Sequence, residues 1–337
     1  MISFEYASPG SLQDALSLLG TKWGPTEILA GGTDLVALMK DYVVTPQRLV
    51  NIKKITGICG VKLTPEKGLG IGALVTLDEL AKHPFVSKYY PTLALAIDDA
   101  ASPQIRNRAT LGGNLCQRPR CWYFRNGYGL IALNAKGQSL VLRGDSRYHA
   151  ILGNGGPAYF VSPSTVAPTL IAYGATVVIQ GPKGIRQVLL EDFYVTPTKE
   201  AQREHDLRPN EILVEIRIPP SFGRTTSYYE VRQKHGFDWP FATASVAMSI
   251  RHQKVQDPVV IMSHVAPIPW RSKEAEVVLA GQRLTPAVAA AAAQAAVKPA
   301  KTLGQNGYKI SIARVAVERC ILQAAGLDPL AGTGTQI

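Results

Sequence analysis

The chain has 337 residues, of which 46% are hydrophobic and 18% charged, and its formal net charge is +11. This length gives room for two domains with packed cores better than for one. The lysines and arginines are scattered, with no run of five or more. That pattern argues against a nucleic-acid-binding tract and favours a basic globular protein or one that binds an anionic cofactor.

Cysteine spacing and apolar runs exclude several further classes. Cys59, Cys116, Cys121 and Cys320 do not have zinc-finger spacing, and a chain of this length needs no disulfide cross-links. The first residues lack a basic segment followed by an apolar one, so no secretory signal is expected. The alanine-rich run 286–297 is too short and too weakly hydrophobic to cross a bilayer. We therefore expect a cytoplasmic protein with neither a membrane nor a nucleic acid as partner.

The N-terminal two thirds of the chain alternate between predicted helices and strands, which is typical of α/β units. Ser11 is a candidate N-cap, and Thr76 with Glu79 forms a T-x-x-E capping box. Residues 116–157 have no hydrophobic period and are interpreted as a long functional loop. Helices are predicted at 8–20, 35–40, 76–82, 92–101 and 165–173, and strands at 27–30, 48–51, 69–74, 158–161 and 176–179.

A second domain is predicted after a break at Pro219 and Pro220. The strand before the break, 212–218, alternates apolar and charged residues. Strands followed by helices indicate a small α+β domain. Its strands are predicted at 226–233, 243–251 and 259–265, and its helices at 272–279, 286–297 and 311–325. The expected boundaries are 1–220, with lobes of about 1–55 and 56–220, and 224–328.

The first glycine-rich loop follows a predicted strand and opens a helix. Gly31 and Gly32 have no side chains, so the backbone can approach phosphate oxygens and adopt φ > 0. Successive amides at a helix start form an anion-binding nest, to which Thr33 adds a hydroxyl. Asp34 cannot bind phosphate directly, so we assign it to capping the following helix.

The second loop, Thr110-Leu111-Gly112-Gly113-Asn114, repeats this logic, with Asn114 bracing the loop or donating to the ligand. A glycine pair between a strand and a helix is also typical of an ordinary tight turn, and the residues alone leave both interpretations open. The G-x-G-x-x-G of a Rossmann fold, the P-loop and the G-x-S-x-G elbow are all absent. The histidines, including His235, show no metal-ligand spacing and are interpreted as surface or core residues.

Because it has both of these loops, the chain resembles the FAD-binding (medium) subunits of the molybdenum hydroxylase, or xanthine dehydrogenase, family. The resemblance rests on segments that spread over most of the chain in the family's order. The stretch R-C-x-Y-F-R resembles most the aldehyde oxidoreductase and 4-hydroxybenzoyl-CoA reductase-like branches. These segments are ILAGGTDLVALMK (28–40), SPQIRNRATLGGNLCQRPRCWYFRNG (102–127), ILVEIRIP (212–219) and YYEVRQKHGFDWPFATASVAM (228–248).

The resemblance implies an α+β protein: a two-lobed FAD-binding domain of the two-glycine-loop (PCMH-type) kind, followed by a small domain with an antiparallel sheet and helices. It implies an oxidoreductase complex in which a large subunit holds the molybdenum–pterin centre and oxidises the substrate. A small subunit with [2Fe–2S] clusters would pass electrons to FAD on this chain, which hands them to an external acceptor. A dimer of such heterotrimers is compatible with this division.

When the family's site residues are carried over to the matching positions, the resemblance implies that the loops hold the diphosphate and that Leu213 lies near the flavin ring. Ser102 and residues 104–107 would shape the second loop, and no catalytic residue or metal ligand is expected here. The expected cofactor residues are Leu29, Ala30, Gly31, Gly32, Thr33, Asp34, Leu35, Ser102, Thr110, Gly112, Gly113, Asn114, Thr165, Leu213 and Glu230.

Three features depart from the family pattern. Thr165 stands where an Asp is usual, and Glu230 stands where a Lys commonly approaches the flavin. Loss of that cation should disfavour anionic reduced flavin or loosen binding, unless Arg232 or Lys234 compensates. Close relatives often carry a [4Fe–4S] cluster on four cysteines of the long loop, but this loop has only Cys116 and Cys121. We therefore expect no iron–sulfur cluster on this chain.

Other interpretations remain open from the sequence. The chain could be a stand-alone FAD-dependent oxidoreductase of the same flavin fold, although we find no convincing acid/base set for one. It could also be a subunit whose flavin site has decayed. Residues 122–124 could stack on the flavin or pack the loop, and Trp239 is expected in the core.

Overall fold

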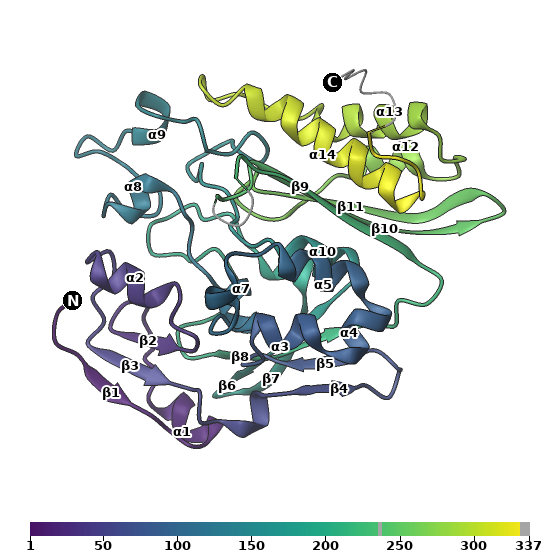
Figure 1. Cartoon of the computed structure of the whole chain (residues 1–337). Coiled ribbons are helices and arrows are strands. Elements are labelled where there is room, and N and C mark those ends of the chain that lie inside the picture. Colours follow the sequence, from purple (N-terminus) through teal and green to yellow (C-terminus); the bar gives the residue numbers. More distant parts are fainter. Residues whose placement is uncertain (235–237, 331–337) are drawn as a thin grey trace.

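The computed structural model describes residues 1–234 and 238–330, which form three sheets and the helices that cover them (Figure 1). The expected role of His235 therefore lies outside the described residues. In the first lobe, strands β1 (Glu5–Ala7), β3 (Arg48–Asn51) and β2 (Thr26–Leu29) form a parallel sheet in that order. Helix α1 (Leu12–Ser17) begins at Ser11, whose side chain accepts from the amide of Asp14 as predicted. Helix α2 (Leu35–Lys40) follows the first glycine loop.

The second lobe is built on a five-stranded antiparallel sheet. Strand β8 (Ile212–Ile218) lies at its centre, between β5 (Leu69–Gly72) and β6 (Thr176–Gly181), while β4 (Val61–Leu63) and β7 (Gly184–Leu189) form the edges. Strands β6 and β7 come between β5 and β8 in the sequence but pair on the other side of β8, so the sheet joins distant parts of the chain. This lobe also contains the 3₁₀ turn η1 (Thr56–Ile58) and helices α3 (Leu77–Lys82), α4 (Pro84–Tyr89), α5 (Pro91–Asp98), α6 (Pro103–Arg106), α7 (Leu111–Leu115), α10 (Ala167–Ala172) and α11 (Leu190–Phe193).

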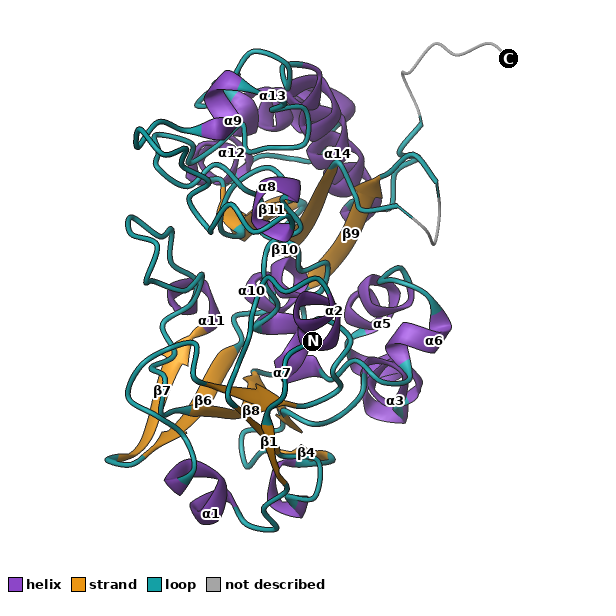
Figure 2. Ribbon diagram, turned by 90° about the vertical axis from the view of Figure 1, so that its left-hand side faces the viewer, coloured by secondary structure: helices purple, strands orange, loops and turns teal. Residues whose placement is uncertain are grey.

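The third lobe has an antiparallel sheet in the order β12 (Trp270–Arg271), β11 (Lys254–Ser263), β10 (Ala242–Arg251) and β9 (Thr225–Val231). One face carries helices α12 (Lys273–Leu279), α13 (Pro286–Val297) and α14 (Tyr308–Ala324), and the other faces α5 and α10 of the second lobe (Figure 2). The alanines of α13 that point inward, such as Ala289, Ala292 and Ala296, are completely buried. Small side chains there let α13 pack closely between its neighbours.

The long loop is mostly irregular, as predicted, and holds only the short helices α8 (Trp122–Arg125) and α9 (Leu140–Arg143). The capping box at Thr76 and Glu79 is present, with both reciprocal hydrogen bonds. The strand predicted at 158–161 is wrong. The Tyr159 carbonyl accepts from the amide of Ala150, but no ladder forms. Strands β1, β4 and β7 and helix α4 were not predicted. Within the described residues, no helix is both long and apolar enough to span a membrane.

Candidate functional site

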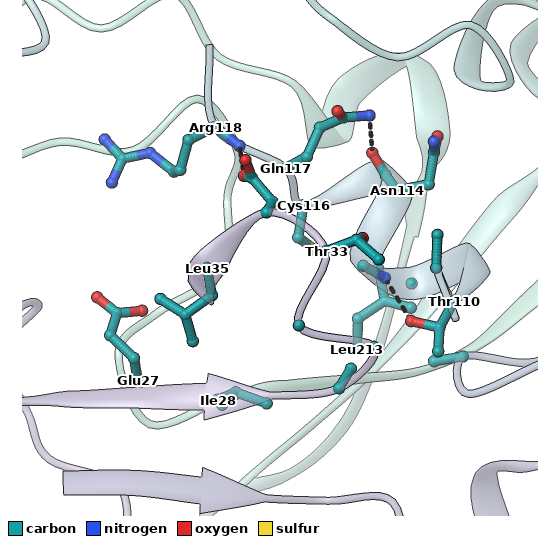
Figure 3. Close-up of a pocket in the computed structure, with 18 of the residues that line it drawn as sticks. Glu27, Ile28, Thr33, Leu35, Thr110, Asn114, Cys116, Gln117, Arg118 and Leu213 are labelled. Atoms are coloured by element: carbon teal, nitrogen blue, oxygen red, sulfur yellow. Dashed lines mark hydrogen bonds between the residues drawn. The ribbon is translucent and has the colours of Figure 1, made fainter. Parts of the chain in front are cut away.

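The two glycine loops meet at a cavity of about 360 Å³ between the first two lobes, with Trp239 of the third lobe also in its lining. In Figure 3, Thr33, Thr110 and Leu213 lie on one side of this cavity, and Glu27, Ile28 and Leu35 lie on the other. The structure brings most of the predicted cofactor residues together here. Those that line the cavity are Ala30, Gly31, Gly32, Thr33, Asp34, Leu35, Thr110, Gly112, Gly113, Asn114, Thr165 and Leu213.

The first loop is built to approach an anion. Its amides at Gly31, Gly32, Thr33 and Asp34 donate no hydrogen bond to any other described residue. Gly32 has φ 78°, which favours glycine, whereas Gly31 is required for space. A Cβ at Gly31 would overlap the carbonyl of Arg108, so the first loop rests directly on the segment that leads into the second. Unpaired amides facing a cavity are the donors that an anion needs.

The second loop works differently, and the expectation that it repeats the amide nest is wrong. Its amides are already used: Leu111 donates to Val75, Gly112 to Ala73 and Asn114 to Thr110. The amide of Gly113 donates to Oγ1 of Thr110 at 3.1 Å. The second loop therefore offers the Thr110 hydroxyl and a wall without side chains, rather than free amides.

The expected capping role of Asp34 is also wrong. Asp34 occupies the N-cap position of α2, but its side chain makes no capping hydrogen bond. Instead, Oδ2 accepts from the amide of Arg118 at 2.8 Å, and Oδ1 pairs with Arg120 at 3.0 Å and Arg125 at 2.8 Å. A carboxylate among three donors gains more than one capping bond would supply. Asp34 thus fastens the first loop to the start of the long loop.

Asn114 and Thr165 border the cavity from the second lobe. Ser164 donates to Oδ1 of Asn114 at 2.7 Å, which fixes the orientation of the Asn114 amide. Thr165, only 5% exposed, is next to Ser164 and lines the cavity with a hydroxyl in place of a carboxylate. Leu213 contributes an apolar surface from β8.

Three expected cofactor residues do not line the cavity. Leu29 packs behind Gly32, and Ser102 caps α6 by accepting from the amide of Ile105 at 3.4 Å. Glu230 on β9 pairs with Nε of Arg232 at 2.5 Å and accepts from the hydroxyl of Tyr228. Arg232 also pairs with Asp99 at 2.9 Å. Glu230 is thus part of a buried ionic bridge between the second and third lobes.

Several cavity residues were missed by the sequence analysis. The cavity arginines each pair with a carboxylate: Arg203 with Glu27 at 2.6 Å, Arg118 with Glu204 at 2.9 Å, and Arg120 with Asp34. The cavity therefore has little uncompensated positive charge, so amide dipoles must do much of the work of holding an anion. The only sequence signal for this was the arginine-rich stretch directly after the second loop.

Burial shifts the pKa of two of these cavity residues. Burial raises the pKa of Glu27 to about 7, although Arg118 opposes the shift. Burial, reinforced by the charge of Arg118, lowers the pKa of His205 to about 3, so the imidazole stays neutral at physiological pH. The ring of His205 stacks on Phe193 with 5.4 Å between centroids. His205 therefore adds an uncharged ring to the cavity lining, whereas Glu27 remains the ion-pair partner of Arg203.

The aromatic residues were partly misassigned. Trp239 was expected in the core, but it is 47% exposed and lies under the guanidinium of Arg120 at 4.6 Å. Trp122 does not line this cavity and instead meets Tyr148 edge-on, with 5.3 Å between ring centroids. Phe124 is buried in a small cluster with Leu38 and Leu130. Residues 122–124 therefore pack the long loop.

The two cysteines of the long loop lie in different surroundings. Cys116 lines the cavity, whereas Sγ of Cys121 lies 3.2 Å from Nε2 of His149. Burial raises the pKa of both thiols, so both keep their protons. In the part of the chain that the structure describes, no group of three or more His, Cys, Asp or Glu residues could hold a metal ion.

Comparisons with known proteins agree over most of the chain. Residues 2–221 match the family described as FAD binding domain in molybdopterin dehydrogenase, and residues 227–324 match the CO dehydrogenase flavoprotein C-terminal domain. The aldehyde oxidoreductase FAD-binding subunit PaoB of Escherichia coli is 36% identical over 252 residues, which cover 74% of this chain and 78% of the relative. The carbon monoxide dehydrogenase medium chain of Hydrogenophaga pseudoflava is 30% identical over 326 residues, which cover 94% and 96%.

Solved structures support the same grouping. A chain of carbon monoxide dehydrogenase from Hydrogenophaga pseudoflava superposes with a TM-score of 0.75 at 29% identity, and the match covers 97% of this chain and 99% of that one. A chain of quinoline 2-oxidoreductase from Pseudomonas putida 86 gives a TM-score of 0.74 at 22% identity, which speaks for the fold alone.

Proposed function

Because the chain belongs to the family of FAD-binding medium subunits of molybdenum hydroxylases, we propose that it holds FAD between its glycine loops and is the electron outlet of an oxidoreductase complex. One observation carries the placement of the cofactor. The free amides of the first loop face a cavity, and Gly31 of that loop packs on the backbone that leads into the second loop. A dinucleotide diphosphate needs this combination of donors and close approach.

The chain's own residues divide the work of binding. Residues 31–34 supply their free amides, and Thr33 also its hydroxyl, to the diphosphate. Thr110 adds a hydroxyl, Gly112 and Gly113 keep the opposite wall free of side chains, and Asn114 and Thr165 orient the cofactor. Leu213 supplies apolar contact for the flavin ring. Ser102 and Glu230 act indirectly, through α6 and through the bridge to Asp99.

Bound FAD would supply the redox chemistry, taking electrons from the iron–sulfur clusters of a partner and passing them to an external acceptor. The chain's contribution is to hold the diphosphate, exclude water with apolar walls and set the charge around the ring. The ion pairs Arg118–Glu204 and Arg203–Glu27 keep that charge nearly balanced.

The partners that we propose are a large subunit with the molybdenum cofactor, where the substrate is oxidised, and a small [2Fe–2S] subunit. This division is supported by relatives named medium chain or FAD-binding subunit, and those names do not favour a stand-alone flavin oxidoreductase. We place the complex in the cytoplasm, as the sequence predicted. We place the domains at 1–220 and 224–328, which the matched ranges support.

We also propose that the chain carries no iron–sulfur cluster. Cys116 lines the flavin cavity, whereas Cys121 is hydrogen-bonded to His149 and does not line it. Two thiols in different surroundings do not supply a four-cysteine site.

The decisive experiment is cofactor analysis of the chain co-expressed with its partner subunits. We expect the chain to release a stoichiometric amount of FAD on denaturation. After removal of the small subunit, the chain should contain no iron. A folded chain that stays colourless at saturating FAD would overturn the proposal. Copurification with a molybdenum-containing subunit separates this function from that of a stand-alone flavoenzyme.

A further inference from the structure

A second cavity, of about 280 Å³, lies beside the flavin cavity and has no role in the function proposed above. Both cavities are bordered by Arg120, Pro163 and Trp239. The guanidinium of Arg120 over the ring of Trp239 forms part of the partition between them. A molecule in the second cavity would therefore be a close neighbour of the flavin site.

The walls of this second cavity are aromatic. Tyr148 and Phe241 are nearly parallel, with an interplanar angle of 9° and 5.8 Å between ring centroids. Trp122 stands perpendicular to Tyr148, and Phe160 and Trp239 complete the walls. Flat walls of this kind favour a planar ligand, because aromatic rings stack or pack edge-on against one another.

The charge in the lining is mostly positive. Lys309 is 1% exposed, and its Nζ donates to the carbonyls of Tyr148, His149 and His264 at 3.3, 3.2 and 2.6 Å. Burial is the sole cause that lowers the pKa of Lys309, to about 7, and no carboxylate opposes it. The one carboxylate in the described lining, Asp238, is exposed. With a pKa of about 7, Lys309 is only partly protonated near neutral pH, and an anion nearby would favour its charged form.

Two buried histidines each have one ring nitrogen that lacks a described partner at hydrogen-bond geometry. His149 is 3% exposed and His264 is 1% exposed. Nδ1 of His149 and Nε2 of His264 meet no described group at hydrogen-bond geometry, although the backbone of Ser146 and Pro163 lies near the two rings. Because Cys121 keeps its proton, its thiol can donate to Nε2 of His149, and the ring proton then lies on Nδ1. Buried polar atoms without a partner are costly, so a ligand that accepts from them gains affinity.

We propose that this cavity binds a small planar anion of the aromatic carboxylate class, next to the flavin. The aromatic walls hold the ring, His149 and His264 donate to the carboxylate, and Lys309 supplies the balancing charge. A cavity of about 280 Å³ admits a ligand with one or two rings but not a dinucleotide.

Equilibrium dialysis of the full chain loaded with FAD tests this proposal, with benzoate, its neutral isostere benzamide and the cation benzylamine as probes. We expect benzoate to bind about tenfold more tightly than benzamide, and benzylamine least of all. The visible flavin spectrum should shift on addition of benzoate, because the cavities share a wall.

Variants separate the charge of the cavity from its aromatic walls. Lys309→Met should weaken benzoate about tenfold and benzamide much less, because it removes the charge together with three hydrogen bonds to backbone carbonyls. Lys298→Met, at an exposed lysine that follows α13, is the matched control and should change neither. Tyr148→Ala should weaken the binding of both benzoate and benzamide. Because Tyr148 is 46% exposed, this variant provides a second test if Lys309→Met does not fold.

Equal binding of benzoate and benzamide, or no binding of either, would overturn the proposal. Displacement of FAD by benzoate would also overturn it, because the cavity would then belong to the flavin. FAD content is measured on the same samples. A chain that binds FAD but not benzoate refutes this inference alone, and one that binds benzoate but not FAD refutes the proposed function alone.

Discussion

Oδ1 of Asp34, in the first glycine loop, lies 3.0 Å from Nη1 of Arg120, which follows the second loop. The same carboxylate pairs with Arg125 and accepts from the amide of Arg118. These contacts join segments that are 84 and 91 positions apart in the sequence. The geometry of the flavin cavity therefore depends on a carboxylate that is held by a cluster of arginines.

Replacing Asp34 should loosen this junction. Asp34→Ala leaves two guanidinium groups and one amide without their acceptor, so we expect the free energy of unfolding to fall by about 1–3 kcal/mol. Asp34→Asn keeps an acceptor but not the charge, so its free energy of unfolding should lie between those of the native chain and Asp34→Ala. Urea unfolding of the FAD-free chain measures the effect. Asp41→Ala, at an exposed position after the same helix, should change stability by less than about 0.5 kcal/mol. Equal effects of the Asp34 and Asp41 variants would show that the junction is not stabilising.

Gly31 tests the contact between the loops. A Cβ at this position overlaps the carbonyl of Arg108, which is backbone and cannot rotate away. Gly31→Ala should therefore separate the loops and weaken FAD at least about tenfold, or by about 1.4 kcal/mol. Flavin absorbance after gel filtration gives the FAD content, and circular dichroism verifies the fold. Gly10→Ala, where no atom lies within 4 Å of an added Cβ, is the control. A folded Gly31→Ala chain with full FAD content would remove Gly31 from the site.

Local signals predicted much of the fold. Helix α13 and strand β8 have the predicted bounds, because the Thr285–Pro286 start and the apolar–charged alternation are both encoded within a few residues. The glycine pair of the first loop was likewise recognisable from the strand before it and the helix after it. These features need no knowledge of distant residues.

Long-range contacts set the parts that the sequence could not predict. The amides of the second loop are used because the carbonyls of Ala73 and Val75 lie beside them, and nothing near Thr110 in sequence indicates that. Asp34 has the usual features of an N-cap, yet charges from the long loop outcompete the cap. Trp239 reaches the cavity only because the third lobe packs on α5 and α10. In each case tertiary packing overrides a local preference.

Thr110 combines a structural and a binding role, which matched variants can separate. Its Oγ1 accepts from the amide of Gly113, and the residue is only 4% exposed. Thr110→Val keeps the shape but leaves that amide unpaired, so we expect a loss of about 1 kcal/mol in unfolding free energy. Thr110→Ser should restore most of it. Urea midpoints with and without FAD give both quantities, since a ligand that binds only the folded chain raises the midpoint. If the FAD-induced rise is the same in Val and Ser variants, the hydroxyl does not contact the cofactor.

Glu230 should make stability depend on pH in a defined direction. Burial raises its pKa to about 7 from an ordinary value of 4.5, while Tyr228 and Arg232 oppose the shift. The folded chain therefore holds a proton that the unfolded chain has lost between pH 4.5 and 7, and stability falls as the pH rises through this window. Glu230→Gln removes this dependence, so the variant should gain stability relative to the native chain between pH 5 and pH 8. Tyr228→Phe removes an opposing hydrogen bond, so its window should extend to higher pH.

The Glu230→Gln variant also tests the expected effect of Glu230 on the flavin. Because Glu230 does not line the cavity and its carboxylate is paired with Arg232, Glu230→Gln should change the flavin potential little. Arg232→Gln should change it more, because the bridge to Asp99 holds the chain just before Ala100 and Ala101, which line the cavity. Spectroelectrochemical titration of the FAD-loaded chain compares the two. A larger shift for Glu230→Gln than for Arg232→Gln would restore the view that this position acts directly on the flavin.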